Sequence, residues 1–469
     1  MFDYTATYTD QYQITMSQVY FHKGMKNETA IFDYFFRKLP FEGGYTIFAG
    51  LEDLLKAIEN LRFDQKDLEL LEKEGMDQEF LDYLEDFKFS GNIYSAKEGD
   101  LIFPNRPVLS VEAPIIEAQL LETLTLNTLN YQSLIATKAS RMRLAAGDRK
   151  LVDFGLRRAP GTGGYAASRA AVIGGFNSTS NVRSGRDYNI PISGTMAHSF
   201  VQRYDEEIDS FRDFAEVRAH DCVLLVDTYD TLKSGVPNAI KVGKEMEERG
   251  EKLKGIRLDS GDLAWLAKES RRMLDEAGLD YVKIAASNQI DEEVIKSLLN
   301  QNAPIDLFGV GTSLVTGRPD SALDGVYKLS YANEEPRLKL SETVSKINLP
   351  GKKQVYRLFN EDGSFYGGEV VALADEDDFD IMVHPSDPKQ SRILTEFTKE
   401  PLLEKVVENG KRISIPRATD EIAEFSRQQL EKLPKEFKRF DNPHAYKVGL
   451  TKKLKELRDS LVHRHKERV

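Results

Sequence analysis

His198 is the first residue whose type and neighbours suggest chemistry. It lies in SGTMAHSF (193–200), among glycine and hydroxyl groups small enough to approach an anion closely. An imidazole can act as a metal ligand, a general base or a nucleophile that carries a phosphoryl group. A lone histidine is more often a hydrogen-bonded structural side chain, and no second histidine or cysteine stands at metal-ligand spacing. The surroundings therefore suit a phosphate or an acyl group without deciding between them.

The segment RLDSGD (257–262) joins an arginine to two carboxylates. Asp259 and Asp262 could hold a magnesium ion or the hydroxyls of a ribose, while Arg257 binds a negative group of the same ligand. A phosphorylated sugar requires this division of roles. The structural alternative is that Asp262 caps the following helix, with Arg257 as its partner.

Two glycine-rich regions favour an anionic ligand. GLRRAPGTGG (155–164) offers the forked donors of Arg157, although such a loop taken alone can also be merely solvated, and GGFNSTSNV (174–182) gathers hydroxyl and amide groups on one turn. FGVGTSLVTG (308–317) places glycines and hydroxyls after an apolar run, where free backbone amides can meet a phosphate.

The elements that must position these groups are short apolar runs alternating with longer polar segments. Four such runs are VLLVDTYDT (223–231), KGIRLDSGD (254–262), YVKIAASNQ (281–289) and IDLFGVGTS (305–313). Repeated βα units predict parallel strands buried on both faces, as a barrel or an open doubly wound sheet. Because the carboxyl ends of such strands lie on one side, we expect Asp227, Asp259, Asn288 and Thr312 to converge.

Composition limits the class of protein. The 469 residues predict two or three domains, and 76 acidic against 64 basic residues, a net charge of −12, argue against a nucleic-acid binder. No apolar run is long enough for a membrane helix. The start lacks a signal-peptide pattern, and Cys222, the one cysteine, rules out an internal disulfide, so we expect a cytoplasmic protein.

The pattern along the chain predicts three parts. Residues 1–125 read as an N-terminal α+β domain, and residues 126–345 carry the βα units. Residues 346–469 form a charged C-terminal extension, with a hairpin expected to turn at EDGS (361–364) and an amphipathic helix at the end of the chain.

The combination and order of these motifs resemble nicotinate phosphoribosyltransferase. The matching segments, each weak alone, are TDQYQITM near the start, DFGLRRA (153–159), GGFNSTSNV (174–182), SGTMAHSF (193–200), VDTYDTLKSGVPNAI (226–240), RLDSGDL (257–263), GVGTSLVTG (309–317) and LPGKKQVYRL (349–358). The resemblance implies the fold of the type II phosphoribosyltransferases, an irregular βα barrel with an N-terminal α+β domain and a C-terminal extension that folds back on it. It also implies a homodimer.

The resemblance implies a reaction as well. Nicotinate and phosphoribosyl diphosphate would give nicotinate mononucleotide and diphosphate in NAD salvage, with ATP and Mg²⁺ taking part and ATP hydrolysis coupled through a phosphorylated histidine. Carried over by motif, His198 accepts the phosphoryl group and Asp259 supports charge on the ribose. No protein ligand of the metal is assigned.

The remaining site residues follow from the same motifs. The nicotinate-binding set is Tyr12, Arg157, Ser180, Thr195 and Arg257. The set for phosphoribosyl diphosphate is Asn288, Gly311, Thr312 and Ser313. In a head-to-tail dimer, Tyr12 could serve the site of the neighbouring subunit.

Two residues of GGFNSTSNV bear on substrate choice and on the alternatives. Relatives that use nicotinamide have an aspartate near Ser180, and a serine does not repel the carboxylate of nicotinate. Asn177 stands where many members have an aspartate, so no catalytic role is assigned to it. A nicotinamide or quinolinate phosphoribosyltransferase stays an alternative, as does a non-catalytic sensor of pyridine nucleotides. SGTMAHSF speaks against the quinolinate enzymes. A sensor is disfavoured by the presence of Arg257, Asp259, His198 and Thr312.

Overall fold

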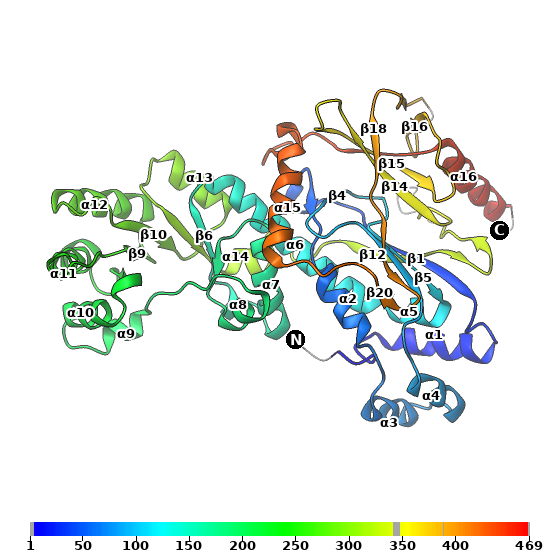
Figure 1. Cartoon of the computed structure of the whole chain (residues 1–469), viewed down its shortest axis with the longest axis horizontal. Coiled ribbons are helices and arrows are strands. Elements are labelled where there is room, and N and C mark those ends of the chain that lie inside the picture. Colours follow the sequence, from blue (N-terminus) through cyan, green and yellow to red (C-terminus); the bar gives the residue numbers. More distant parts are fainter. Residues whose placement is uncertain (1–3, 341–347, 388, 468–469) are drawn as a thin grey trace. The chain divides into compact units, whose positions relative to one another are not determined.

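The computed structural model describes residues 4–340, 348–387 and 389–467 (Figure 1). The chain forms two compact units, the first made of residues 1–137 and 322–469 and the second of residues 138–321. Within the described ranges, no helix combines the length and the apolar character needed to cross a membrane. The three-part division at residues 125 and 345 stays a prediction.

The first unit contains an antiparallel seven-stranded sheet with the order β13-β12-β1-β5-β3-β19-β20. Its strands are β1 (Thr29–Phe36), β3 (Asn92–Ser95), β5 (Leu109–Pro114), β12 (Gly325–Ala332), β13 (Glu335–Pro336), β19 (Glu404–Glu408) and β20 (Lys411–Arg412). Phe32, Tyr34 and Phe36 alternate along β1 and pack into the main core of this unit. Because β19 pairs with β3, this sheet joins a strand from the C-terminal part of the chain to strands from its N-terminal part.

The first unit also contains a mixed six-stranded sheet. In addition, β2 (Thr46–Ile47) and β4 (Leu101–Ile102) form a small two-stranded sheet. The order of the six-stranded sheet is β17-β16-β21-β15-β14-β18. The strands are β14 (Lys353–Phe359), β15 (Phe365–Leu373), β16 (Ile381–Val383), β17 (Ser391–Ile393), β18 (Thr398–Pro401) and β21 (Lys447–Leu450). β14 and β15 pair antiparallel, which confirms the hairpin predicted to turn at EDGS.

The helices of the first unit begin and end at the following residues: α1 (Gln11–His22), α2 (Leu51–Glu59), α3 (Gln65–Lys73), α4 (Gln78–Glu85), α5 (Ile115–Leu120), α6 (Glu122–Ala146, which continues into the second unit), α15 (Thr419–Lys432) and α16 (Lys452–Lys466). α16 buries Leu454 and Leu461, as its amphipathic pattern predicted.

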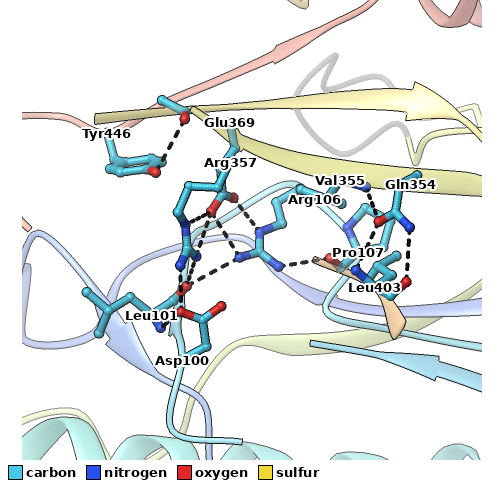
Figure 2. Close-up of polar contacts among 11 residues, drawn as sticks. Asp100, Leu101, Arg106, Pro107, Gln354, Val355, Arg357, Glu369, Leu403 and Tyr446 are labelled. Carbon is cyan, nitrogen blue, oxygen red and sulfur yellow. Dashed lines mark hydrogen bonds and ion pairs between the residues drawn. The ribbon is translucent and has the colours of Figure 1, made fainter. Parts of the chain in front are cut away.

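A buried ion cluster ties the hairpin to the segment around β4 (Figure 2). Arg357 on β14 contacts Asp100 at 2.5 Å and Glu369 on β15 at 2.8 Å, and Arg106 contacts Glu369 at 2.7 Å. Burial alone would lower the pKa of the Arg357 guanidinium, but Asp100 and Glu369 outweigh it and raise that pKa. Two arginines and two carboxylates thus compensate one another inside the unit.

The second unit is built on a parallel six-stranded sheet with the order β7-β6-β11-β10-β9-β8. Its strands are β6 (Lys150–Asp153), β7 (Ser178–Thr179), β8 (Val223–Leu225), β9 (Gly255–Leu258), β10 (Lys283–Ser287) and β11 (Leu307–Val310). The four apolar runs form β8 to β11, which confirms the parallel α/β prediction. The sheet ends at β7 and β8, which do not pair with each other in the described residues, so it is an open sheet and the closed barrel stays a prediction.

The helices of the second unit are α7 (Gly161–Ile173), α8 (Val182–Tyr188), α9 (His198–Gln202), α10 (Glu207–Val217), α11 (Val236–Glu248), α12 (Leu263–Glu276), α13 (Glu292–Asn300) and α14 (Thr312–Val315). Side-chain caps fix where several begin: Asn181 caps α8 and Asp291 caps α13. Gly235 closes a single turn of π-helix (Thr231–Gly235) against β8, and a Cβ there would lie 1.8 Å from the carbonyl oxygen of Val226. These constraints place the loops that follow the strands.

Candidate active site

Two carboxylates meet where the neighbouring strands β8 and β9 end. Oδ2 of Asp227 accepts hydrogen bonds from the backbone N–H of Asp259 at 2.8 Å and from the hydroxyl of Ser260 at 2.7 Å. Asp259 in turn accepts a hydrogen bond from the hydroxyl of Ser287, at the end of β10. The other oxygen of Asp227, Oδ1, is buried and has no hydrogen-bond partner among the residues that the structure describes. An unpartnered buried carboxylate oxygen favours the approach of a cation or a proton donor.

His198 faces these carboxylates from the first turn of α9. Its Nδ1 lies 3.1 Å from the Thr228 hydroxyl oxygen, and its Nε2 lies 4.0 Å from Oδ1 of Asp227 and 3.8 Å from Oδ2 of Asp259. The imidazole is 39% exposed while the Asp227 side chain is 1% exposed. The ring is therefore held at one nitrogen and remains accessible to a ligand beside two acids.

Arg257 forms the neighbouring part of the site from β9. Its Nη1 donates to the Thr195 hydroxyl at 2.6 Å and its Nη2 donates to the carbonyl of Met196 at 3.1 Å. Its Nε is buried and has no hydrogen-bond partner within the described ranges. Burial lowers the pKa of this guanidinium, against the opposing effects of Asp259 and Asp227. The positive charge of Arg157 also lowers this pKa. The forked donors of Arg257 suit an anionic ligand group.

Asp153, at the end of β6, organises the loops that carry Arg157 and Ser180. Its carboxylate accepts hydrogen bonds from the backbone N–H of Gly155 at 2.7 Å, from Ser168 at 2.8 Å and from Thr179 at 2.7 Å. Its backbone carbonyl accepts from the N–H of Ser180 at 2.8 Å. Burial raises the pKa of Asp153 despite these three donors.

The predicted phosphate-binding residues occupy the ends of β10 and β11. Asn288 follows β10 in the left-handed region, with φ of 76°, and Gly311 leads from β11 into α14, which begins with Thr312 and Ser313. These residues share the carboxyl edge of the sheet with His198. In the part of the chain that the structure describes, no hydrogen bond or ion pair links them to His198, Asp227 or Asp259.

Three other residues discussed from the sequence lie elsewhere or have structural partners. Tyr12 belongs to the first unit, on α1, with its side chain exposed. Asp262 accepts from the backbone N–H of Trp265 and caps α12, as the structural alternative predicted, although Arg257 is not its partner. Asn177 accepts hydrogen bonds from Leu151 and Arg143, which agrees with assigning it no catalytic role.

Sequence reasoning expected Asp227 among the converging side chains but gave it no role in the reaction, and it assigned no site role to Thr228 or Asp153. The signal for Asp227 is present in VLLVD, an apolar run followed at once by an acid, like IRLD at Asp259. The contact of Thr228 with His198 joins residues thirty positions apart, and no local pattern reports it.

A parallel βα sheet whose carboxyl edge carries a histidine, two acids and a half-buried arginine is the arrangement of an enzyme that binds anionic substrates. Three family models match the chain: the nicotinate phosphoribosyltransferase (NAPRTase) N-terminal domain over residues 7–130, the NAPRTase family over residues 149–352 and the C-terminal domain over residues 352–458. The chain belongs to the nicotinate phosphoribosyltransferase family and is an enzyme of that family.

Individual relatives agree with the family models. The nicotinate phosphoribosyltransferase of Bacillus subtilis is 44% identical, over 100% of this chain and 97% of its own length. Nicotinate phosphoribosyltransferase pncB2 of Mycobacterium tuberculosis is 41% identical, over 96% of this chain and 92% of its own. Among solved structures, human nicotinic acid phosphoribosyltransferase matches with a TM-score of 0.88 and 30% identity, covering 97% of this chain and 99% of the human chain.

Proposed function

We propose that the chain makes nicotinate mononucleotide and diphosphate from nicotinate and 5-phosphoribosyl 1-diphosphate, a salvage step toward NAD, with ATP hydrolysis coupled through a phosphorylated His198. The observation that carries the proposal is the placement of His198, anchored by Thr228 and accessible to a ligand beside Asp227 and Asp259. The activities named for the relatives support the choice of substrates.

In the coupling step, a ring nitrogen of His198 displaces ADP from the γ-phosphorus of ATP and water later releases the phosphate. The ring nitrogen supplies the electron pair of the new P–N bond, and the bridging oxygen of ADP takes the electrons of the broken P–O bond. Thr228 fixes the orientation of the imidazole, so little rotational freedom is lost when the phosphoryl group arrives.

The carboxylates fit a magnesium ion that enters with the phosphates. In the described residues, no group of three or more His, Cys, Asp or Glu side chains could hold a metal ion without help from a ligand. Magnesium usually takes one or two protein carboxylates and completes its shell with phosphate oxygens and water. The unpartnered Oδ1 of Asp227 and the adjacent Asp259 would supply those carboxylates. The ion would neutralise charge on the phosphates and on the departing diphosphate.

In the glycosyl step, the ring nitrogen of nicotinate attacks the anomeric carbon as diphosphate leaves. Positive charge develops on the ribose, and Asp259 stabilises it. Arg257 and Thr195 would bind the nicotinate carboxylate, with Arg157 nearby. The pyridine nitrogen is already a nucleophile, so the protein needs to supply alignment and charge stabilisation and no strong base.

The remaining contacts complete the proposed site. Asn288, Gly311, Thr312 and Ser313 would hold phosphate at the ends of β10 and β11. Ser180 presents a hydroxyl where an aspartate would repel nicotinate, which favours nicotinate over nicotinamide. Tyr12 would stack on the pyridine ring, supplied by the neighbouring subunit of a homodimer.

Offering the three pyridines separately tests this function. The protein is incubated with phosphoribosyl diphosphate, ATP, magnesium and either nicotinate, nicotinamide or quinolinate, and mononucleotide formation is followed by chromatography. Product from nicotinate in large excess over the other two is expected. No product from nicotinate, or faster product from nicotinamide, would overturn the assignment.

A further inference from the structure

A large cavity in the first unit has no role in the proposed reaction. Its volume is about 1130 Å³, slightly above the range of about 300–1,000 Å³ typical of small-molecule sites. Its lining residues come from β1, from the segment 104–107 before β5 and from the mixed sheet that carries β15 and β16. Figure 1 shows where these strands lie in the first unit. All of its lining residues belong to the first unit.

The charge of this cavity is opposite to that of the whole chain. Eight of the described lining residues are Arg or Lys, and Asp33 is the one carboxylate among them. The chain as a whole has 76 acidic and 64 basic residues. An excess of cations on a concave surface concentrates positive potential and attracts anions.

Ion pairs compensate the cations of the inner wall. Lys353 pairs with Asp33 at 2.8 Å, and Arg106 pairs with Glu369 at 2.7 Å. Burial lowers the pKa of Lys353, against the effect of Asp33. The deep wall of the cavity is therefore close to neutral.

The remaining lining cations differ from one another, since Arg458 pairs at 2.7 Å with Asp459, a carboxylate that does not line the cavity. Within the described residues, four of them have no carboxylate within ion-pair distance: Arg37, Lys38, Lys389 and Lys447. The Arg392 guanidinium lies 5.5 Å and the Lys447 ammonium 5.8 Å from the centre of the Tyr366 ring. Arg392 also pairs with Glu396, which does not line the cavity, whereas Lys447 has no carboxylate partner among the described residues.

We propose that this cavity is a second anion-binding site, for a small ligand that carries two or more phosphate groups. Several separated cations around one concave space match several separated negative charges better than a single phosphate or carboxylate. The size of the cavity admits a sugar bisphosphate, a nucleotide or free diphosphate, whose shared chemistry is the polyphosphate charge. The site lies in the first unit, whereas the catalytic residues after β8 and β9 lie in the second.

Calorimetric titration of the full-length protein with inorganic diphosphate tests the proposal. Two diphosphates are expected per wild-type chain, one in the cavity and one at the predicted phosphate loop of the second unit. The double variant R392E/K447E is expected to bind diphosphate in the cavity at least about a hundredfold more weakly, because each lost charge-assisted contact contributes about tenfold or more. The same variant keeps the second diphosphate.

Two controls separate this result from a general charge effect and from failure of the proposed function. K66E/K88E makes the same change in net charge at exposed lysines that do not line the cavity, and it should keep both sites. T312D places a carboxylate in the phosphate loop and should remove the other diphosphate. If the catalytic site binds no diphosphate, the wild type shows one site, lost in R392E/K447E and kept in T312D.

Diphosphate binding by R392E/K447E equal to that of the wild type would overturn the proposal. If the double variant does not fold, K447Q alone, at an exposed position, is titrated instead, and unchanged affinity there has the same meaning. Titration with glucose 1,6-bisphosphate and with ADP then distinguishes sugar bisphosphates from nucleotides. A preference for either ligand supports the proposed site. If the cavity binds neither of these ligands and no diphosphate, the proposal is overturned.

Discussion

The candidate active site at the ends of β8 and β9 and the buried ion cluster around Glu369 contain the same types of charged residue. They differ in how far the charges are paired with one another. In the cluster, Arg106 and Arg357 find Glu369 and Asp100 within 3 Å, and all four side chains are buried (Figure 2). At the strand ends, Arg257 donates to a hydroxyl and a carbonyl, and the nearest carboxylate contacts of His198 are 3.8 and 4.0 Å away.

The difference separates charges that hold the fold from charges kept for a ligand. A buried ion pair offsets its own desolvation only when its geometry is complete, and removing one partner leaves an uncompensated charge. An enzyme site retains unsatisfied groups because the substrate satisfies them, at some cost in stability. We therefore expect mutations in the cluster to reduce stability and mutations at the strand ends to reduce activity.

Glu369→Ala should give the largest effect. It leaves two buried guanidiniums short of a carboxylate, and the free energy of unfolding should fall by about 3–5 kcal/mol. Denaturant unfolding followed by circular dichroism measures this change. As a matched control, Glu424→Ala removes an exposed partner of Arg427, and the free energy of unfolding should change little because solvent screens that ion pair. Equal losses of unfolding free energy in the two variants would contradict the stabilising role of the buried ion cluster.

Asp259→Asn should reduce kcat by about 10²–10³, with little change in unfolding, because it removes charge stabilisation of the ribose and a proposed magnesium ligand. Steady-state rates of mononucleotide formation measure the loss. Asp262→Asn, which keeps an effective helix cap three residues away, should be close to wild type. A large loss of stability in Asp259→Asn would show that Asp259 stabilises the fold, as the charges of the buried ion cluster do, and would contradict the expected effect on activity alone.

Arg257→Lys should raise KM for nicotinate about ten- to a hundredfold, since a single ammonium cannot reproduce the forked contacts to Thr195 and Met196 while binding a carboxylate. Initial rates at varied nicotinate provide the test. A change confined to the KM for phosphoribosyl diphosphate would instead place Arg257 at the phosphate.

Asp153 should produce the smallest effect, one visible in the pH dependence of stability. Its pKa is raised in the folded protein, so the native state binds more protons than the unfolded state between the unfolded value of about 3.9 and the raised value. Its contribution to stability is thus full below that range and declines as the pH rises through it. The difference in unfolding free energy between wild type and Asp153→Asn should show this slope, and a slope of opposite sign would contradict the assignment.

The sequence predicted the parts of the fold and site that local patterns encode. Apolar runs followed by polar clusters identified β8 to β11, and each motif placed Arg257, Asp259 and Thr312 just after or at the end of a strand. The sequence also predicted, as one alternative, that Asp262 caps a helix, because an aspartate just before a helix commonly accepts a hydrogen bond from a backbone N–H of the first turn. These features depend on neighbours in the chain.

The features that the sequence did not reveal depend on residues far apart. Asp227 resembles many acids that follow a strand, and its role is visible only when Asp259, Ser260 and His198 surround it. The pairing of β19 with β3 and the cluster around Glu369 join segments separated by most of the chain. No periodicity specifies such pairings, because any strand of suitable polarity could occupy the same edge.

Phosphoryl transfer from ATP to His198 tests the central claim most directly. The protein is incubated with magnesium and ATP labelled at the γ-phosphate, and the label retained on the denatured chain is quantified and mapped. A single acid-labile, base-stable label is expected, absent from His198→Ala and kept in His220→Ala, which alters an exposed histidine of the same unit. Label that persists in His198→Ala, or a wild-type chain that takes up none while turning over ATP, would contradict the account.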